Sequence, residues 1–345
     1  MTTSPVKEHI GNARFQNALA RRAQPTPPIW LMRQAGRYHR HYQALRQKYS
    51  FMDLCKQPEL AAAVALGPVL DFDFDAGILF SDLLFPLEAL GMGLEYTDRG
   101  PQLGWNLDGQ TLAQLRSIDD AWPHLLFQGE AMRATREVLP ADRSLIGFVG
   151  GPWTLFVYAV EGSHKGSLIE SKKLLSLFPR FCETMVPLLR RNIELQLDAS
   201  AEVVMIFDTA AGELSPEIFK AEVAPQLQAL TAQDASRIGY YSKGTQPAHL
   251  RHPLFVDGGL AGVGVDSRWE MSEAFDLFPR GFVQGNFDQA LLLGETNDLK
   301  RHLDLYLRPL QSRPGWICGL GHGVLPGTPE DNVRLFVDTV REVMQ

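Results

Sequence analysis

Short apolar runs rich in β-branched and aromatic residues recur along the chain, and most of them are separated by amphipathic stretches. Such runs, bounded by turn-forming residues, predict buried β-strands. Eight strands are predicted, at Pro28–Met32, Ala76–Phe80, Ser144–Val149, Val203–Phe207, Arg237–Tyr241, Gly262–Asp266, Gly281–Gln284 and Gly315–Cys318. Leu254–Val256 competes with Gly262–Asp266 as the sixth strand, and we prefer the latter because Ala248–Leu254 can form part of the preceding helix.

Amphipathic helices are predicted between several of these strands and at the end of the chain. Phe181–Leu197 and Glu330–Met344 both place apolar residues on one helical face. Strands that alternate with helices favour a parallel sheet with helical crossovers, and eight such strands can close into a barrel. We therefore expect an α/β fold, a single (β/α)8 barrel of the TIM type, with an N-terminal helical extension and loop insertions.

The competing architecture is an open, doubly wound parallel sheet. A dinucleotide-binding version of that fold has a G-x-G-x-x-G turn that opens a helix after the first strand, and no such motif follows Met32. Between the second and third predicted strands, Glu95–Leu107 is rich in turn residues and predicts an inserted lid or packing hairpin.

Length and composition favour one large domain. Length alone suggests two domains of about 150 residues each, yet α/β barrels commonly reach about 250 residues, and more with insertions. The 345 residues are 45% hydrophobic and 21% charged, and no Gly/Ser linker, low-complexity tract or strong repeat divides them. We predict that residues 1–345 form a single barrel domain.

Charge and cysteine content argue against several classes of partner. The formal net charge of -7 argues against nucleic acid. Met1–Ile10 is polar and lacks an apolar signal core, and the apolar run Leu60–Leu70 is too short to span a bilayer. Cys55, Cys182 and Cys318 lie far apart, which indicates neither a disulfide framework nor a zinc knuckle. We expect a cytoplasmic protein with no membrane partner.

Small or polar residues come immediately after several of the predicted strands. They are Ser81, Asp82, Gly150, Gly151, Asp208, Thr209, Ser242, Lys243, Asn286, Gly321 and His322. In an α/β barrel the catalytic groups stand on the loops at the carboxyl ends of the strands. These residues therefore indicate a common site on one face of the barrel.

Two arginines, Arg33 and Arg37, lie directly after the first predicted strand and are candidates for an anion site. A guanidinium group can make two hydrogen bonds to one carboxylate, although a solvated loop or a salt-bridge cluster would also explain the pair. Asp82 is either the cap of a following helix or a charge that faces the pocket. Tyr158 is either a core residue with its hydroxyl group satisfied or a pocket residue.

Gly150 and Gly151 can let the backbone approach a ligand closely, and Pro152 can open a helix. Thr209 is either a pocket residue or a helix cap. His322 stands between two glycines, which is an unusual setting for a histidine.

Five ordered segments resemble those of the uroporphyrinogen decarboxylase family. The first is Pro28–Tyr38, P-I-W-L-M-R-Q-A-G-R-Y, and the others are Gly147–Gly162, Ile206–Gly212, Gln284–Asp288 and Gly319–Thr328. The resemblance extends from about Ala18 to Gln345. It implies an α/β barrel that acts as a homodimer without cofactor or metal. The implied reaction converts uroporphyrinogen III to coproporphyrinogen III, by removing four acetate carboxyl groups, in tetrapyrrole and haem synthesis.

The resemblance also implies roles for individual residues. Asp82 would be a carboxylate beside the pyrrole N–H groups, with Phe80 and Ser81 next to it, and Phe207 and Thr209 would face the tetrapyrrole. Arg33 and Arg37 would hold carboxylate arms, with hydrogen bonds from Tyr158 and His322. Arg37, Tyr158, a water molecule and the substrate's own carboxyl group all remain candidates for the proton donor. The implied catalytic residues are Asp82, Arg37 and Tyr158.

The chain departs from the family pattern at three places. His39-Arg40-His41 stand where the family usually has Leu-Pro-Glu, so the start of the following helix can differ and can carry extra positive charge. Ser267 follows Asp266 where tryptophan is common, and Ala210-Ala211 follow Thr209.

Two alternative functions use the same fold or the same ligand. One is a zinc- and cobalamin-linked methyltransferase, which requires soft ligands such as a His-x-Cys pair, and none of the three cysteines has a histidine two residues before it. The other is a non-catalytic tetrapyrrole-binding protein, in which Asp82 would only repel a polycarboxylate.

Overall fold

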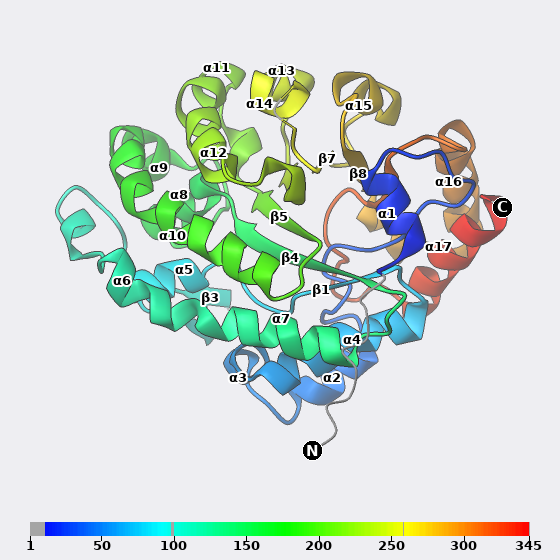
Figure 1. Ribbon diagram of the computed structural model, residues 1–345, viewed down its shortest axis with the longest axis horizontal. Coiled ribbons are helices and arrows are strands. Elements are labelled where there is room, and N and C mark those ends of the chain that lie inside the picture. Colours follow the sequence, from blue (N-terminus) through cyan, green and yellow to red (C-terminus); the bar gives the residue numbers. More distant parts are fainter. Residues whose placement is uncertain (1–10, 98–99, 258, 345) are drawn as a thin grey trace.

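The computed structural model describes residues 11–97, 100–257 and 259–344, so Met1–Ile10 lies outside the described residues (Figure 1). Its main sheet has seven parallel strands in the order β1-β4-β5-β6-β7-β8-β9. They are β1 Ala76–Ile78, β4 Ser144–Gly150, β5 Val203–Asp208, β6 Ile238–Ser242, β7 Gly262–Gly264, β8 Phe282–Phe287 and β9 Trp316–Leu320. A doubly wound sheet would require the strand order to reverse, and this order never does. The curled α/β barrel architecture is therefore confirmed.

The first predicted strand, Pro28–Met32, is the one that the structure changes. Only Ile29 pairs with the sheet, through a parallel bridge to Cys318 of β9. On its other side, the Asp75 N–H group, just before β1, donates to the Ile29 carbonyl oxygen at 2.9 Å. This short segment thus links the two edge strands. It is not a full strand because Asp75 and Gln34 side chains accept from the Ile29 and Leu31 N–H groups.

The helices lie around the strands (Figure 1). Their bounds are α1 Ala13–Leu19, α2 Arg40–Arg46, α3 Phe51–Lys56, α4 Pro58–Phe72, α5 Phe85–Leu87, α6 Ile118–Ala121, α7 Leu126–Val138, α8 Pro152–Glu161, α9 Ile169–Lys173, α10 Phe178–Asp198, α11 Pro216–Ile218, α12 Ala224–Thr231, α13 Pro247–Leu250, α14 Pro253–Val256, α15 Met271–Leu277, α16 Thr296–Leu307 and α17 Glu330–Val343. Helix α1 precedes the barrel, as predicted. The alternative strand Leu254–Val256 is wrong, because those residues lie in α14. No helix within the described ranges is both long and apolar enough to cross a membrane.

The turn-rich insertion after β1 contains an antiparallel hairpin. Its strands are β2 Glu95–Thr97 and β3 Gly100–Gln102, and Tyr96 pairs with Pro101. Pro101 lines the cavity described below, and the Tyr96 hydroxyl group is buried. The hairpin alternative is confirmed, and the hairpin contributes to the wall of the site.

Asp75 holds the closure of the barrel together at the amino end of β1. Its fully buried carboxylate accepts hydrogen bonds from Asn12 Nδ2 at 3.1 Å and from the Ile29 N–H group at 2.7 Å. It also forms ion pairs with Arg14 at 2.7 Å and with Arg341 of α17 at 2.6 Å. One side chain therefore connects the N-terminal segment, the bridging residue and the last helix. Charge-assisted hydrogen bonds of this kind are stronger than neutral ones.

Candidate active site

A cavity opens at the carboxyl ends of the strands. It encloses about 910 Å³ of space not filled by atoms, part of it open to solvent. All of the predicted site residues except Arg37 line it, namely Arg33, Phe80, Ser81, Asp82, Tyr158, Phe207, Thr209 and His322. These side chains come from β5 itself, from the loops after β1, β5 and β9, from α8 and from the turn after Ile29. The barrel thus brings together residues far apart in the chain.

Asp82 is the carboxylate of this cavity. Its Oδ1 atom accepts from the Leu84 N–H group at 2.9 Å and so holds the turn into α5, although the cap of that helix is Leu84. Burial raises the pKa of Asp82, against smaller opposing effects of the Leu84 N–H group, the Tyr96 phenol and the Arg33 guanidinium. The carboxylate therefore lies in the wall of the cavity, as the pocket alternative predicts, and the capping alternative is wrong because the N-cap of α5 is Leu84.

Arg33 stands at the open mouth of the cavity, with an exposed side chain. Its backbone has a φ of 60°, in the left-handed region that non-glycine residues rarely adopt. Gly323 gives its side chain room, since a Cβ atom there would lie 2.4 Å from Arg33 Cδ. Strained backbone of this kind concentrates at functional sites. Neither Arg33 nor Lys243 belongs to any ion pair of the described residues.

His322, which follows β9, is held by Tyr241 of β6, three strands away in the sheet. The Tyr241 hydroxyl group donates to the Gly321 carbonyl oxygen at 2.7 Å and lies 3.0 Å from His322 Nδ1. Burial, followed by the charges of Arg33 and Lys243, lowers the pKa of His322 to about 3. The neutral ring then donates from Nδ1 to Tyr241 and leaves Nε2 as an acceptor. His322 can donate to an arriving carboxylate either by gaining a proton, which the carboxylate favours, or by moving its one N–H to Nε2 while Nδ1 accepts from Tyr241.

Tyr158 lies on α8 and reaches the cavity, so the pocket alternative is favoured over the core one. Its hydroxyl group is hydrogen bonded to His164 Nδ1, in the loop after α8. Burial and the nearby Asp82 raise the pKa of Tyr158 to about 12. His164 was not predicted from the sequence, because no motif marks a contact made by a loop that folds back.

The glycines before α8 have a different role from the one expected. A Cβ atom on Gly151 would lie 2.5 Å from Asp208 Cγ, and one on Gly150 would lie 2.9 Å from Leu155. The glycines thus make room for the protein's own side chains, and neither lines the cavity. Pro152 opens α8, as predicted.

Aromatic rings form part of the cavity wall. The rings of Phe148 and Phe207 have centroids 5.5 Å apart, and Phe207 also meets Tyr241 edge to face at 6.0 Å. Ser81 Oγ accepts from Gln128 at 2.8 Å. The helical turn after Thr209 is capped by Ala210, so the capping alternative for Thr209 is wrong. The result is a largely apolar chamber with a few placed charges, a usual form for a small-molecule site.

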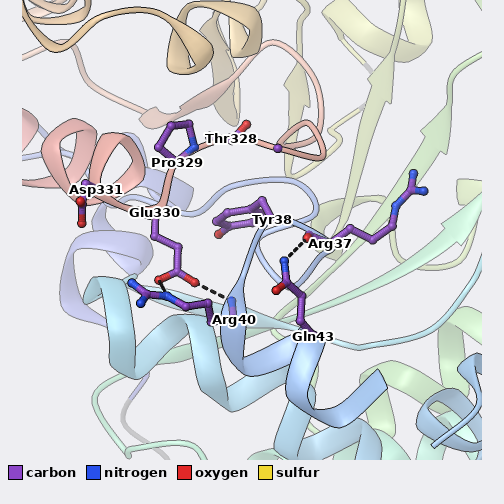
Figure 2. Close-up of a pocket in the computed structure, with 9 residues that line it drawn as sticks. Arg37, Tyr38, Arg40, Gln43, Thr328, Pro329, Glu330 and Asp331 are labelled. Carbon is purple, nitrogen blue, oxygen red and sulfur yellow. Dashed lines mark hydrogen bonds and ion pairs between the residues drawn. The ribbon is translucent and has the colours of Figure 1, made fainter. Parts of the chain in front are cut away.

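Arg37 lies outside this cavity, in a neighbouring surface pocket (Figure 2). Its exposed side chain points away from the ion pair between Arg40 and Glu330, and its carbonyl oxygen accepts from Gln43 at 2.7 Å. The structure thus brings one of the two predicted arginines to Asp82. The role of Arg37 stays a prediction.

The unusual His39-Arg40-His41 segment anchors the start of α2. His39 Nε2 lies 2.7 Å from Asp71, Arg40 pairs with Glu330 of α17 at 2.9 Å, and His41 Nε2 lies 2.9 Å from the Ala63 carbonyl oxygen. The positive charge of Arg40 is therefore balanced within the fold and is not offered to the cavity.

Within residues 11–97, 100–257 and 259–344, no three His, Cys, Asp or Glu side chains converge as a metal site. Cys55, Cys182 and Cys318 are buried and free, and burial raises the pKa of each thiol. The thiolate form that binds zinc is thus disfavoured at all three.

The family model and the sequence relatives carry the same name. A family model described as "Uroporphyrinogen decarboxylase (URO-D)" matches residues 11–343. A protein named uroporphyrinogen decarboxylase from Anaeromyxobacter dehalogenans is 37% identical over 95% of this chain and 97% of its own. One of the same name from Solibacter usitatus is 33% identical over 96% and 97%. Among solved structures, a methyltransferase from Methanosarcina mazei has a TM-score of 0.78 at 22% identity, over 96% of this chain and 98% of its own. At that identity, the last likeness shows the fold alone.

Proposed function

The chain belongs to the uroporphyrinogen decarboxylase family, and we propose that it removes the four acetate carboxyl groups of uroporphyrinogen III in the cavity around Asp82, giving coproporphyrinogen III. The observation that carries the proposal is a half-buried carboxylate, Asp82, in an aromatic-walled cavity that Arg33 also lines, and Arg33 belongs to no ion pair of the described residues. A site for a molecule with eight carboxylates has no use for a carboxylate of its own unless positive charge develops beside it.

The substrate supplies that positive charge. Loss of CO2 from an acetate arm leaves an electron pair on carbon, which needs an acceptor. Protonation of the electron-rich pyrrole at an α-carbon gives an iminium-like ring that accepts this pair. We therefore propose that the reaction needs no cofactor or metal, because the macrocycle is its own electron acceptor.

Asp82 stabilises the cationic ring as it forms. The turn held by Leu84 fixes the carboxylate before substrate arrives, and burial strengthens its interaction with a pyrrole cation. Removal of one preorganised group of this kind costs about 3 to 4 kcal/mol of barrier, or roughly 100- to 1000-fold in rate.

Cationic side chains bind the carboxylate arms. Arg33 lines the cavity, and Lys243 lies near enough to His322 to lower its pKa. Neither belongs to an ion pair of the described residues, and His322 becomes a donor once a carboxylate approaches it. Phe80, Ser81, Phe207 and Thr209 surround the ring. Arg37, which is exposed beside the cavity residues in the chain, would bind an arm that extends out of the mouth.

Tyr158 is the proton donor that we favour. Its pKa of about 12 is high, but an arginine side chain is a still weaker acid. The hydroxyl group lines the cavity near Asp82, where the ring must be protonated. We further propose, from the family, that the chain acts as a single-domain homodimer in the cytoplasm.

The decisive experiment supplies purified, chelator-treated protein with uroporphyrinogen III under anaerobic conditions and follows coproporphyrinogen III by chromatography. Asp82→Asn keeps the shape and loses the charge, and we expect a fall in kcat of about 100- to 1000-fold. The matched control is Asp338→Asn, which removes a carboxylate from the exposed face of α17. Full turnover by Asp82→Asn would refute the mechanism, and an absolute metal requirement would refute cofactor independence.

A further inference from the structure

The proposed reaction consumes protons inside the cavity. Each decarboxylation converts an acetate arm and one proton into a methyl group and CO2, so four arms consume four protons. In the proposed complex the macrocycle fills the cavity that Asp82 and Tyr158 both line. The following inference rests on the proposed function and concerns how Tyr158 regains its proton.

His164 is placed to supply it. The Tyr158 hydroxyl group is hydrogen bonded to His164 Nδ1. The centroids of the two rings are 5.1 Å apart, and the ring planes meet at 57°. The imidazole is half-buried, whereas the next residue, Lys165, is exposed. The side chain therefore lies between the cavity wall and the surface.

The loop that carries His164 is built to fold back. The Gly162 N–H group donates to the Tyr158 carbonyl oxygen at 2.9 Å and ends α8, with Gly162 at a φ of 71°. Gly166 also has a positive φ, 75°. Glycine adopts this conformation without a steric penalty, so the chain can return His164 over the end of its own helix.

The surroundings of His164 favour its neutral form. Burial lowers the pKa of His164, and the charges of Lys243, Arg33 and Lys165 lower it further. A neutral imidazole has one N–H donor and one lone pair, so it can accept a proton at one nitrogen while it donates from the other. These are the properties that a relay requires.

We infer that His164 relays solvent protons to Tyr158. When the Tyr158 O–H bond breaks and a C–H bond forms at the pyrrole α-carbon, the Nδ1 proton of His164 moves to the phenolic oxygen. Once CO2 has left, the exocyclic methylene carbon takes up a proton and the α-carbon releases the one that it gained, so the net uptake is one proton for each methyl group formed. Nε2 takes a proton from water at the surface, and the ring returns to its starting tautomer by passing Nδ1 its next proton through a ring flip or tautomer exchange. One proton enters for each carboxyl group lost, and no oxidant or reductant is needed.

The test is the steady-state rate of decarboxylation, in which every step after the first needs a reprotonated Tyr158, measured for His164→Ala, Tyr158→Phe and the double variant. We expect His164→Ala to lower this rate about tenfold or more, with KM changed less than about twofold, and added imidazole to restore part of the rate. The double variant should be no slower than Tyr158→Phe, because residues on one path are not additive. Ser167→Ala, on the exposed part of the same loop, is the matched control.

Other results would overturn the relay. An unchanged rate in His164→Ala, a raised KM with an unchanged rate, or additive losses in the double variant would each do so. The second result would mean that His164 only binds a carboxylate arm. Absence of turnover in the unsubstituted protein would instead refute the proposed function, so the two failures are distinguishable.

Discussion

Asp208 makes the stability of this protein depend on pH in a direction opposite to that of most aspartates. It is fully buried at the end of β5, where it accepts from Thr154 Oγ1 at 2.6 Å, from the Thr154 N–H group at 3.1 Å and from the Tyr240 hydroxyl group at 3.2 Å. Burial outweighs these donors and raises its pKa from 3.8 to about 6. The folded state therefore binds this proton more tightly than the unfolded state does.

The sign and size follow from linkage between protonation and folding. Stability from protonated Asp208 is fully present below about pH 4 and is lost as the pH rises through about 6, a total of about 3 kcal/mol. Between pH 5 and pH 7 the loss is about 1 kcal/mol. Asp208→Asn mimics the protonated form, since its amide oxygen can still accept from Thr154, and the variant should lack this dependence.

The assay is urea unfolding of the unsubstituted protein and of Asp208→Asn at pH 5 and pH 7. The change in unfolding free energy between the two pH values is compared between the two proteins, so that the contributions of other titrating groups cancel. Relative to Asp208→Asn, the unsubstituted protein should lose about 1 kcal/mol of unfolding free energy on going to pH 7. Asp338→Asn controls for the change of net charge. Equal pH dependence in the unsubstituted protein and Asp208→Asn, or a loss at pH 5 instead of pH 7, would refute the reasoning.

Two further predictions concern how the fold holds the site. Gly323→Ala should push the Arg33 side chain away and raise KM about tenfold, which corresponds to the loss of one charge-assisted hydrogen bond. The melting temperature should not change. Steady-state kinetics on uroporphyrinogen measure the effect, and an unchanged KM would contradict it. Asp75→Ala should lower the free energy of unfolding by about 3 to 5 kcal/mol, because it leaves Arg14 and Arg341 without their partner; a loss below 1 kcal/mol in urea unfolding would contradict this.

Local pattern was enough to predict most of the barrel. Strands such as β4 and β5 are buried along their whole length, and such continuous apolar runs are visible in the sequence. The preference for Gly262–Asp266 over Leu254–Val256 was right for the same reason, although β7 itself ends at Gly264. Pro28–Met32 was overextended because side chains replace the ladder hydrogen bonds there, and no local pattern reveals that exchange.

The sequence by itself determined the barrel and the kind of chemistry, because strand periodicity, strand-end residues and the family motifs are properties of neighbours in the chain. Only the tertiary structure decided which groups meet. Arg33 lines the cavity but Arg37 does not. The Asp208 side chain fills the space beside Gly151, and Tyr241 contacts His322. The physical reason is that these contacts join residues tens to hundreds of positions apart, and their energies depend on burial and distance, which exist only once the chain has folded.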